Sequence, residues 1–225
     1  MPRQAPTPAE LDPKRQAGRV VRALVKLYPE PRCALVHRDA FELLVATILS
    51  AQCTDVRVNM VTPALFALYP DARALAAADL AEVERLVHST GFFRAKAANL
   101  VAMAGRLVEL HGGQVPRDLE ALTALPGVGR KTAHVVMGNA FRIPSGVVVD
   151  THVKRLSMRL GLTTKTDPER VERDLEAIVP KSHWIDFSHR LIEHGRRTCI
   201  ALRPRCDACE LASFCPQIGV TTRGV

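Results

Sequence analysis

A lysine near the start of an expected helix is the first residue whose position in the chain suggests chemistry. Residues 125–133 read LPGVGRKTA, which predicts a tight hairpin at 126–129 and a helix from about 130 to 141. Lys131 falls in the first helical turn, where Asp and Glu are usual and the helix dipole disfavours another positive charge. The dipole and partial burial would favour the neutral amine, a nucleophile that can form a Schiff base. The alternative is an ordinary solvated lysine.

The hairpin itself predicts an anion site. We expect a short helix over 118–125, capped by Asp118, before the turn. The backbone N–H groups of Gly127, Val128 and Gly129 would then point outward at the N-terminus of the second helix, where phosphate binds well. The alternative is a helical corner in which glycine serves only the turn.

Asp150 is the second candidate for chemistry, because it follows three valines and precedes a helical pattern. It is well placed as an N-cap, and a capping carboxylate suits the stabilisation of a developing cation better than proton abstraction from water. His152, two residues on, would orient Asp150 or line a pocket. A structural role for this histidine is the alternative.

Four of the six cysteines lie close together near the end of the chain. Cys199, Cys206, Cys209 and Cys215 have the spacing C-x6-C-x2-C-x5-C. Such a group suits either a tetrahedral metal ion or an iron–sulfur cluster, and the spacing alone leaves zinc and a cluster open. Four unrelated core cysteines are the third alternative. The other two cysteines have no partner at such spacing and are expected to be small buried residues.

The string at 125–133, the VDTH at 149–152 and the cysteine spacing together resemble the endonuclease III family. These are bifunctional DNA glycosylases and abasic-site lyases of the helix-hairpin-helix superfamily, and the resemblance covers about 19–215. It implies that Lys131 attacks the sugar C1′ with help from Asp150, and that the four cysteines hold a [4Fe–4S] cluster.

The resemblance also implies residues that contact DNA. An enzyme of this kind must extrude a nucleotide from the duplex, and something must fill the gap. Residues 49–55 (LSAQCTD) resemble the filling segment, with Gln52 bonding the orphaned base. Residues 91–96 (GFFRAK) match a second insert, with Phe92 where leucine is familiar. Arg203 and Arg205 would contact phosphates. The alternatives are an ordinary loop glutamine, a core phenylalanine and solvated arginines.

The elements that must position these residues read as helices throughout. Apolar residues recur at helical spacing along most of the chain and period-2 alternation is nearly absent, so we predict an all-α fold. The resemblance implies two helical domains, 33–144 and 1–32 plus 145–225, with the helix-hairpin-helix at about 118–141 and the cluster loop at 199–215. Lys131 and Asp150 would face each other across an interdomain cleft.

Composition limits the class of partner. The 225 residues carry a net charge of +8, which suggests a polyanion, or else a membrane surface. No apolar run approaches ~18 residues, so we expect no membrane span. The N-terminus lacks the apolar core of a signal peptide and reads as a disordered lead-in. We therefore expect a cytoplasmic, nucleoid-associated monomer.

We accordingly predict removal of oxidised pyrimidines from double-stranded DNA, with lyase action at abasic sites through β-elimination. One alternative is a monofunctional glycosylase of the same superfamily, such as the adenine mismatch enzyme. Such enzymes use an activated water and lack the lysine, and that enzyme has a further C-terminal domain, whereas this chain ends ten residues after Cys215. The other alternative is a non-catalytic DNA-binding module with a structural metal.

Overall fold

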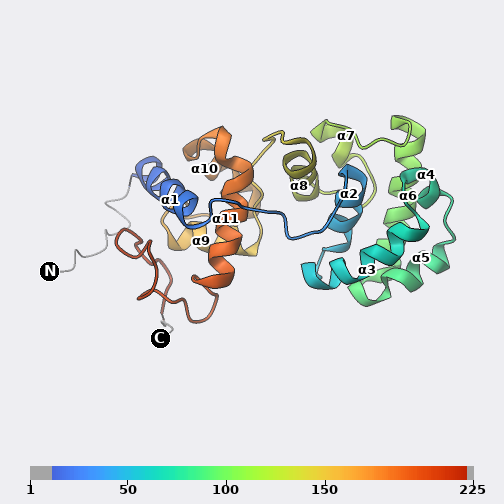
Figure 1. The fold of residues 1–225 in the computed structure, drawn as a ribbon. Helices are drawn as coiled ribbons and strands as arrows, with labels where there is room; N and C mark the ends of the chain where they lie inside the picture. Colours follow the sequence, from blue (N-terminus) through green and yellow to red (C-terminus); the bar gives the residue numbers. More distant parts are fainter. Residues whose placement is uncertain (1–11, 222–225) are drawn as a thin grey trace. The chain divides into compact units, whose positions relative to one another are not determined.

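The computed structural model describes residues 12–221, and its regular elements in that range are helices joined by loops (Figure 1). No strand occurs among these residues, which confirms the all-α prediction. The expected disordered lead-in falls largely outside the described residues. Nor does any helix in 12–221 have the length and apolar character that crossing a membrane requires.

The α-helices are α1 (Pro13–Leu27), α2 (Ala40–Leu49), α3 (Asp55–Leu68), α4 (Ala72–Ala76), α5 (Leu80–Val87), α6 (Phe93–His111), α7 (Leu119–Thr123), α8 (Arg130–Phe141), α9 (Thr151–Arg159), α10 (Pro168–Ile178) and α11 (Trp184–Arg197). The described residues also form the short 3-10 helices η2 (His88–Thr90) and η3 (Lys181–His183). The sequence pattern missed α4, because five residues are too few to show a helical stripe.

Side-chain caps explain where most of these helices begin. A carboxylate or hydroxyl oxygen just before the helix accepts a hydrogen bond from a first-turn N–H group that has no partner within the helix. The capping residues are Asp12, Asp39, Thr54, Asp71, Asp79, Asp118, Asp150 and Asp167. The caps expected from the sequence at Asp118 and Asp150 are confirmed.

The chain packs as two units, and the first to consider is Cys33–Ser145. Its core surrounds α2, which packs against α3, α6 and α8. Nine of the ten residues of α2 are buried. Full burial of each leucine of α2, such as Leu43 or Leu44, contributes about 1.5–3 kcal/mol. The helix α8, which carries Lys131, therefore packs against a central apolar helix.

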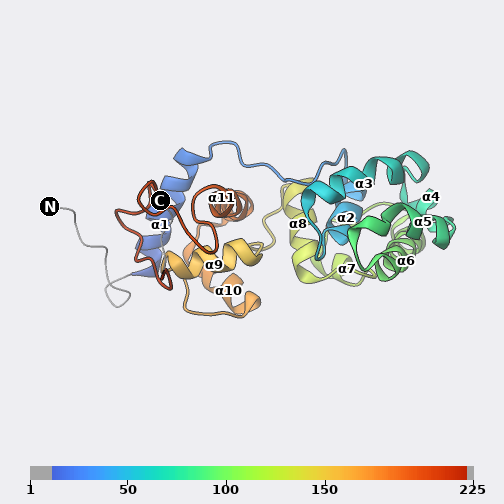
Figure 2. The same ribbon diagram turned by 90° about the horizontal axis from the view of Figure 1, so that it is seen from below.

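The second unit joins Met1–Arg32 to Gly146–Val225. Within it α1 packs against α10 and α11, which are far away in sequence (Figure 2). The buried Gln16 of α1 donates two hydrogen bonds through Nε2, to the carbonyl of Leu160 at 2.9 Å and to that of Phe214 at 3.0 Å. These bonds attach α1 to the end of α9 and to the cysteine-rich segment.

Close packing between α9 and α11 depends on Gly195. A Cβ at this position would lie 2.8 Å from Nδ1 of His152 and 3.0 Å from Nη2 of Arg155. Because real Cβ atoms do not approach so closely, the absence of a side chain lets the two helices meet here. The helix that Asp150 caps is thus held directly against α11.

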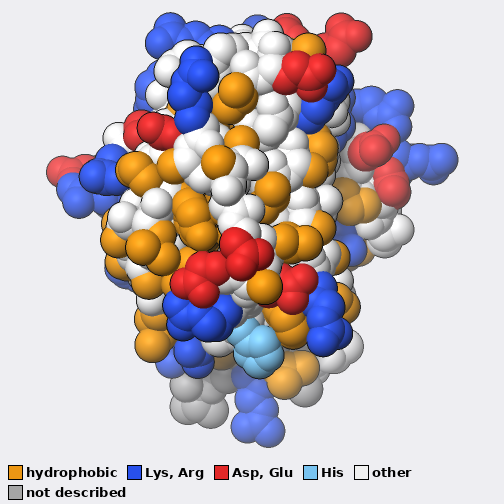
Figure 3. Space-filling view, turned by 90° about the vertical axis from the view of Figure 1, so that its right-hand side faces the viewer, with side chains coloured by type: hydrophobic (Ala, Val, Ile, Leu, Met, Phe, Trp, Pro, Cys, Tyr) orange, Lys and Arg blue, Asp and Glu red, His pale blue; other side chains and the backbone are white. Residues whose placement is uncertain are grey.

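The face of the Cys33–Ser145 unit around α4, α5 and α6 mixes acidic, basic and hydrophobic side chains (Figure 3). Arg85 pairs with Glu82 at 2.6 Å, and Arg106 with Glu109 at 2.8 Å. The net positive charge is therefore not collected into one basic patch on this face. The functional domains and the interdomain cleft implied by the resemblance stay predictions.

Candidate functional site

The helix-hairpin-helix consists of α7, α8 and the turn between them. The bounds of α8 are those predicted, whereas α7 ends at Thr123, two residues before the predicted end. Asp118 caps α7 by accepting a hydrogen bond from the N–H of Ala121 at 2.8 Å. In the turn, the N–H of Leu125 donates to the carbonyl of Leu122, and the N–H of Val128 donates to that of Leu125, both at 3.1 Å. The side chains of Leu122, Leu125 and Val128 are buried in the core. The turn is thus fixed from inside by three apolar residues.

The two glycines of the turn have different physical roles. Gly127 has a φ of +73°, and a Cβ there would lie 2.8 Å from the Cβ of Asn99 in α6. Gly129 has a φ of −85° and a ψ of 171°, which any residue adopts, and a Cβ there would meet nothing within 4 Å. The turn therefore requires glycine at 127, both for its backbone angle and for the contact with α6, but not at 129.

The N-terminus of α8 presents backbone N–H groups to the surroundings. Gly127 and Gly129 are exposed, and no side chain within the described chain caps α8. The expectation of three outward amides is wrong for Val128, because its N–H is bonded to Leu125. The uncapped helix start and the two exposed glycines remain suited to an anion, since backbone N–H groups at a helix start and the helix dipole both favour negative charge.

Lys131 lies in the first turn of α8, where the sequence places it. Its side chain is exposed, so the expectation of partial burial is wrong. An exposed amine two residues beyond Gly129 is within reach of a molecule that binds at the uncapped helix start. The alternative interpretation of Lys131 as a solvated lysine is therefore compatible with its exposure. Its chemistry depends on what binds beside it.

Asp150 is partly buried and caps α9, in the Gly146–Val225 part of the second unit. Its Oδ1 accepts a hydrogen bond from the N–H of Val153 at 2.7 Å, which fixes the orientation of the carboxylate. Nδ1 of His152 lies 3.2 Å from Nη2 of Arg155, which can only donate. The expected role of His152 beside Asp150 or in a pocket stays a prediction.

Arg155 connects the helix of Asp150 to the cysteine-rich segment, and the sequence analysis missed it. Its Nη2 also donates to the carbonyl of Gly195 at 3.2 Å and to that of Cys199 at 3.0 Å. Burial lowers the pKa of this guanidinium, as does Arg159, while Cys199 and Asp150 act in the opposite direction. No sequence signal marks Arg155, because its partners are backbone carbonyls about 40 residues away.

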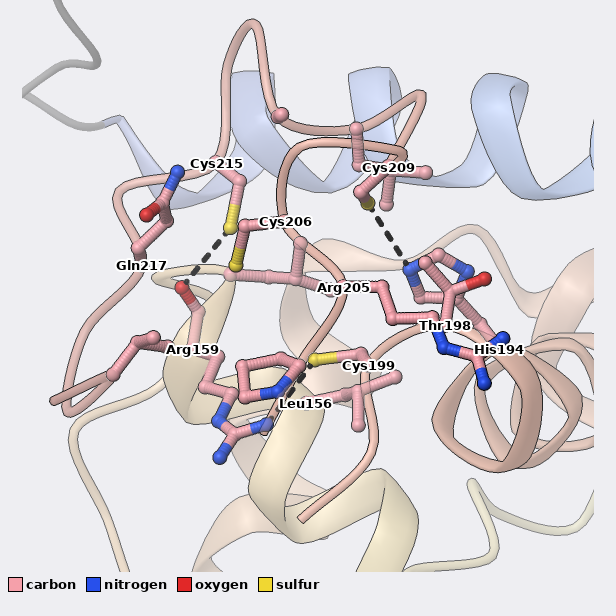
Figure 4. Close-up of a pocket in the computed structure, with 15 residues that line it drawn as sticks. Leu156, Arg159, His194, Thr198, Cys199, Arg205, Cys206, Cys209, Cys215 and Gln217 are labelled. Atoms are coloured by element: carbon pink, nitrogen blue, oxygen red, sulfur yellow. Dashed lines mark hydrogen bonds between the residues drawn. The ribbon is translucent and has the colours of Figure 1, made fainter. Parts of the chain in front are cut away.

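The four cysteines predicted as ligands come together around one pocket (Figure 4). The rest of its lining is largely apolar and includes Leu156, Leu160, Leu211, Ala212 and Val220. Within residues 12–221 no three His, Cys, Asp or Glu side chains are grouped as the ligands of a single metal ion. The four sulfur atoms therefore line one apolar pocket, but they are not arranged around a single metal position.

Arg159 holds both ends of the segment that carries these cysteines. Its side chain is buried, and it donates to the carbonyl of Ile200 at 2.8 Å and to that of Ala201 at 2.6 Å. Nη1 also lies 3.4 Å from Sγ of Cys199, while the backbone carbonyl of Arg159 accepts from Sγ of Cys215 at 3.5 Å. A single buried arginine thus joins the first and last of the four cysteines.

His194 adds a polar contact to Cys209. Its Nε2 lies 3.5 Å from Sγ of Cys209, and its Nδ1 lies 3.0 Å from the hydroxyl of Tyr28. Burial lowers the pKa of His194 to about 4, so the ring is neutral at pH 7. Burial also raises the pKa of Cys209, and it raises that of Cys215 to about 12. These thiols stay protonated at neutral pH unless a metal displaces the proton.

The loop between the first two cysteines is accessible. Arg203 and Arg205 are both exposed, and the intervening Pro204 is buried against the pocket. The N–H of Arg205 donates to the carbonyl of Thr198 at 3.0 Å, which closes the loop on itself. The guanidinium groups are therefore displayed from a folded loop, and their contact with phosphates stays a prediction.

The two residues predicted to fill a gap in DNA share an unusual backbone. Gln52 has a φ of +52° and Phe92 a φ of +49°, the left-handed region that non-glycine residues rarely adopt. Gln52 is exposed, and Phe92 is 67% exposed. The alternative of Phe92 as a core aromatic is therefore wrong. An exposed aromatic side chain on a strained turn is typical of a residue that contacts a binding partner.

Comparison with known proteins adds independent findings. The family model described as "HhH-GPD superfamily base excision DNA repair protein" matches residues 45–181. The chain is 56% identical to endonuclease III of Synechocystis sp. over 204 residues, which are 91% of this chain and 93% of that protein.

Solved structures agree. A non-covalent endonuclease III–DNA complex matches with a TM-score of 0.86 and 43% identity, over 91% of this chain and 95% of that one. A trapped endonuclease III–DNA covalent intermediate, an estranged-adenine complex, matches with the same TM-score and identity over 91% and 96%.

The two glycines of the turn provide a matched pair of variants. Gly127→Ala should lower the free energy of unfolding by about 2–3 kcal/mol, because it combines a left-handed backbone with a clash against Asn99. Gly129→Ala should change it by less than about 1 kcal/mol. Urea unfolding followed by circular dichroism measures both. Equal destabilisation by the two variants would contradict the distinction.

Proposed function

The chain belongs to the endonuclease III family within the HhH-GPD superfamily of base excision DNA repair proteins. We propose how its residues act as a DNA glycosylase with abasic-site lyase activity. The observation that carries the proposal is the helix-hairpin-helix. Its turn ends in an uncapped helix start, and an exposed lysine follows within one turn.

A phosphate of the damaged strand binds at the start of α8. The exposed backbone at Gly127 and Gly129 and the first turn of α8, which no side chain caps, supply N–H donors. Base chemistry inside a duplex requires extrusion of the nucleotide. Binding the strand beside the lesion brings the sugar of that nucleotide toward Lys131.

Lys131 is the nucleophile of the proposal. Its neutral Nζ attacks C1′, the C1′–N bond breaks, and the base leaves with the bonding electron pair and takes up a proton. Ring opening then gives a Schiff base between C1′ and Nζ. Loss of a proton from C2′ expels the 3′ phosphate by β-elimination, and water releases the lysine. The relative that was trapped as a covalent intermediate with DNA supports this covalent route.

Asp150 assists this step electrostatically. A carboxylate whose Oδ1 is fixed by the N–H of Val153 is oriented without rearrangement, which suits stabilisation of a cationic sugar. It can also take the proton of the Lys131 ammonium before attack. His152, Arg203 and Arg205 are DNA contacts in this proposal, the two arginines through phosphates because their side chains are exposed.

The substrate class is duplex DNA with an oxidised pyrimidine or an abasic site, acted on by a monomer located with the chromosome. The resemblance to the family supports this choice of lesion. A relative bound non-covalently to DNA supports the choice of partner. The lesion specificity of this chain then depends on the pocket that receives the base and on Gln52 and Phe92.

Cys199, Cys206, Cys209 and Cys215 are the ligands of a [4Fe–4S] cluster. The donor set fits, because four thiols line one apolar pocket and Arg159 and His194 place nitrogen atoms beside two of the sulfurs. Four thiols in one pocket suit either zinc or a cluster, and the resemblance of their spacing to that of the endonuclease III family supports the cluster. When bound, the cluster would supply four metal–thiolate bonds that hold the C-terminal segment folded.

Borohydride trapping tests the lyase. We expect the protein to form a covalent adduct with abasic-site DNA in the presence of borohydride, and Lys131→Gln to reduce the adduct yield by on the order of a thousandfold or more. The matched control is Lys165→Gln, another exposed lysine, which should trap as wild type. A monofunctional glycosylase would release bases without trapping, and a binding module would do neither.

The cluster is tested through the arginine that holds its segment. Wild-type protein should show a broad visible absorbance and contain iron and sulfide, whereas zinc would leave it colourless. Arg159→Lys should lose this absorbance faster under a chelator, since it gives up charge-assisted hydrogen bonds worth about 1.5–3 kcal/mol each. Arg203→Lys, at an exposed position, should behave as wild type. Equal rates for the two variants would contradict the anchoring role.

A further inference from the structure

A buried lysine connects the turns that carry Gln52 and Phe92. Lys96 lies in α6 and is only 5% exposed. Its Nζ donates to the carbonyl of Leu49 at 2.9 Å and to the carbonyl of Thr90 at 2.8 Å. Leu49 ends α2 and Thr90 ends η2, so one ammonium group joins the last residues of two separate helices.

Each acceptor lies just before one of the strained residues. Leu49 is three residues before Gln52, and Thr90 is two residues before Phe92. Lys96 also binds the second turn through its backbone, because its N–H donates to the carbonyl of Phe92 at 3.1 Å. The side chain and main chain of one residue thus hold one turn, while the same side chain reaches across to the other.

The acceptors suit a cation. Carbonyl groups at helix C-termini lack partners within the helix and carry the negative end of its dipole. Two such groups converge on the Lys96 ammonium, and hydrogen bonds from a charged donor are stronger than neutral ones. Lys96 therefore joins the two turns through charged, directional hydrogen bonds.

Burial works against this arrangement. It lowers the pKa of Lys96, and the nearby Cys53 opposes that shift. A methionine could fill similar space without the cost of desolvating a charge. What an apolar side chain could not do is bind both carbonyls and so fix the distance between the turns.

We propose that Lys96 is a positioning residue that holds Gln52 and Phe92 in a fixed mutual arrangement, so that both enter duplex DNA together when a nucleotide is extruded. The proposal rests on the proposed glycosylase function. Phe92 presents a ring that can stack on a base, and Gln52 an amide that can both donate to and accept from the orphaned base. Filling one gap with two side chains requires that their separation match it, and Lys96 sets that separation.

The test compares two DNA substrates under single-turnover conditions. One is duplex DNA with an oxidised pyrimidine, where a stack must be opened and a gap filled. The other is a single strand with an abasic site, which has neither an orphaned base nor a partner strand. We expect Lys96→Met to slow excision from the duplex by roughly tenfold or more, as for misplaced groups generally, and to trap the single strand at the wild-type rate. A loss of general stability would affect both substrates alike.

A double-mutant cycle makes the test specific. If Lys96 acts through the two turns, adding Lys96→Met to a Gln52→Ala, Phe92→Ala background should cost little further excision activity. Additive losses, or equal losses on both substrates, would overturn the proposal. Arg106→Met removes the same charge from an exposed site on α6 and should leave both rates unchanged.

A variant that fails to fold and a wild-type protein without activity lead to different conclusions. If Lys96→Met does not fold, Lys96→Gln, which keeps a neutral N–H donor, is put through the same comparison with the same criteria. Folding is checked by circular dichroism and thermal unfolding. If the wild-type protein neither excises the oxidised base nor forms a trapped adduct with abasic-site DNA, the proposed function is wrong. The proposed role of Lys96 is then wrong as well. An active wild type with insensitive Lys96 variants overturns only the Lys96 proposal.

Discussion

The contact between Gly127 and Asn99 determines where α8 begins, and the candidate chemistry depends on that point. With a side chain at 127 the turn could not lie so close to α6, because a Cβ would approach Asn99 to 2.8 Å. The turn leads directly into a helix start without a side-chain cap, and Lys131 follows at its second residue. One close backbone contact thus places both the anion-binding N–H groups and the amine.

Buried Lys96 and Arg159 and half-buried Arg155 stabilise other parts of the structure in a common way. Lys96, Arg155 and Arg159 each bind backbone carbonyls that lie far away in sequence. A carbonyl at a helix end or in a loop lacks a regular partner, so a cation that reaches it offsets part of its own desolvation. Lys96 does this for the turns of Gln52 and Phe92, and the two arginines do it for the cysteine-rich segment.

Local features were predictable from the sequence, while features that depend on distant partners were not. The limits of α8, its preceding turn and the caps at Asp118 and Asp150 follow from residue types and spacing. The bond from Val128 to Leu125 and the exposure of Lys131 depend on the path of the folded chain. The burial of Lys96 could not be predicted from the sequence pattern, because its hydrogen-bond acceptors are backbone carbonyls, which every residue has.

The most direct test of the account is to locate the covalent bond. Wild-type protein is trapped on abasic-site DNA with borohydride, digested with nuclease and protease, and analysed by tandem mass spectrometry. The account predicts that the reduced sugar remnant is attached to Nζ of Lys131. A remnant on another lysine or on the N-terminal amine, with Lys131 unmodified, would contradict it.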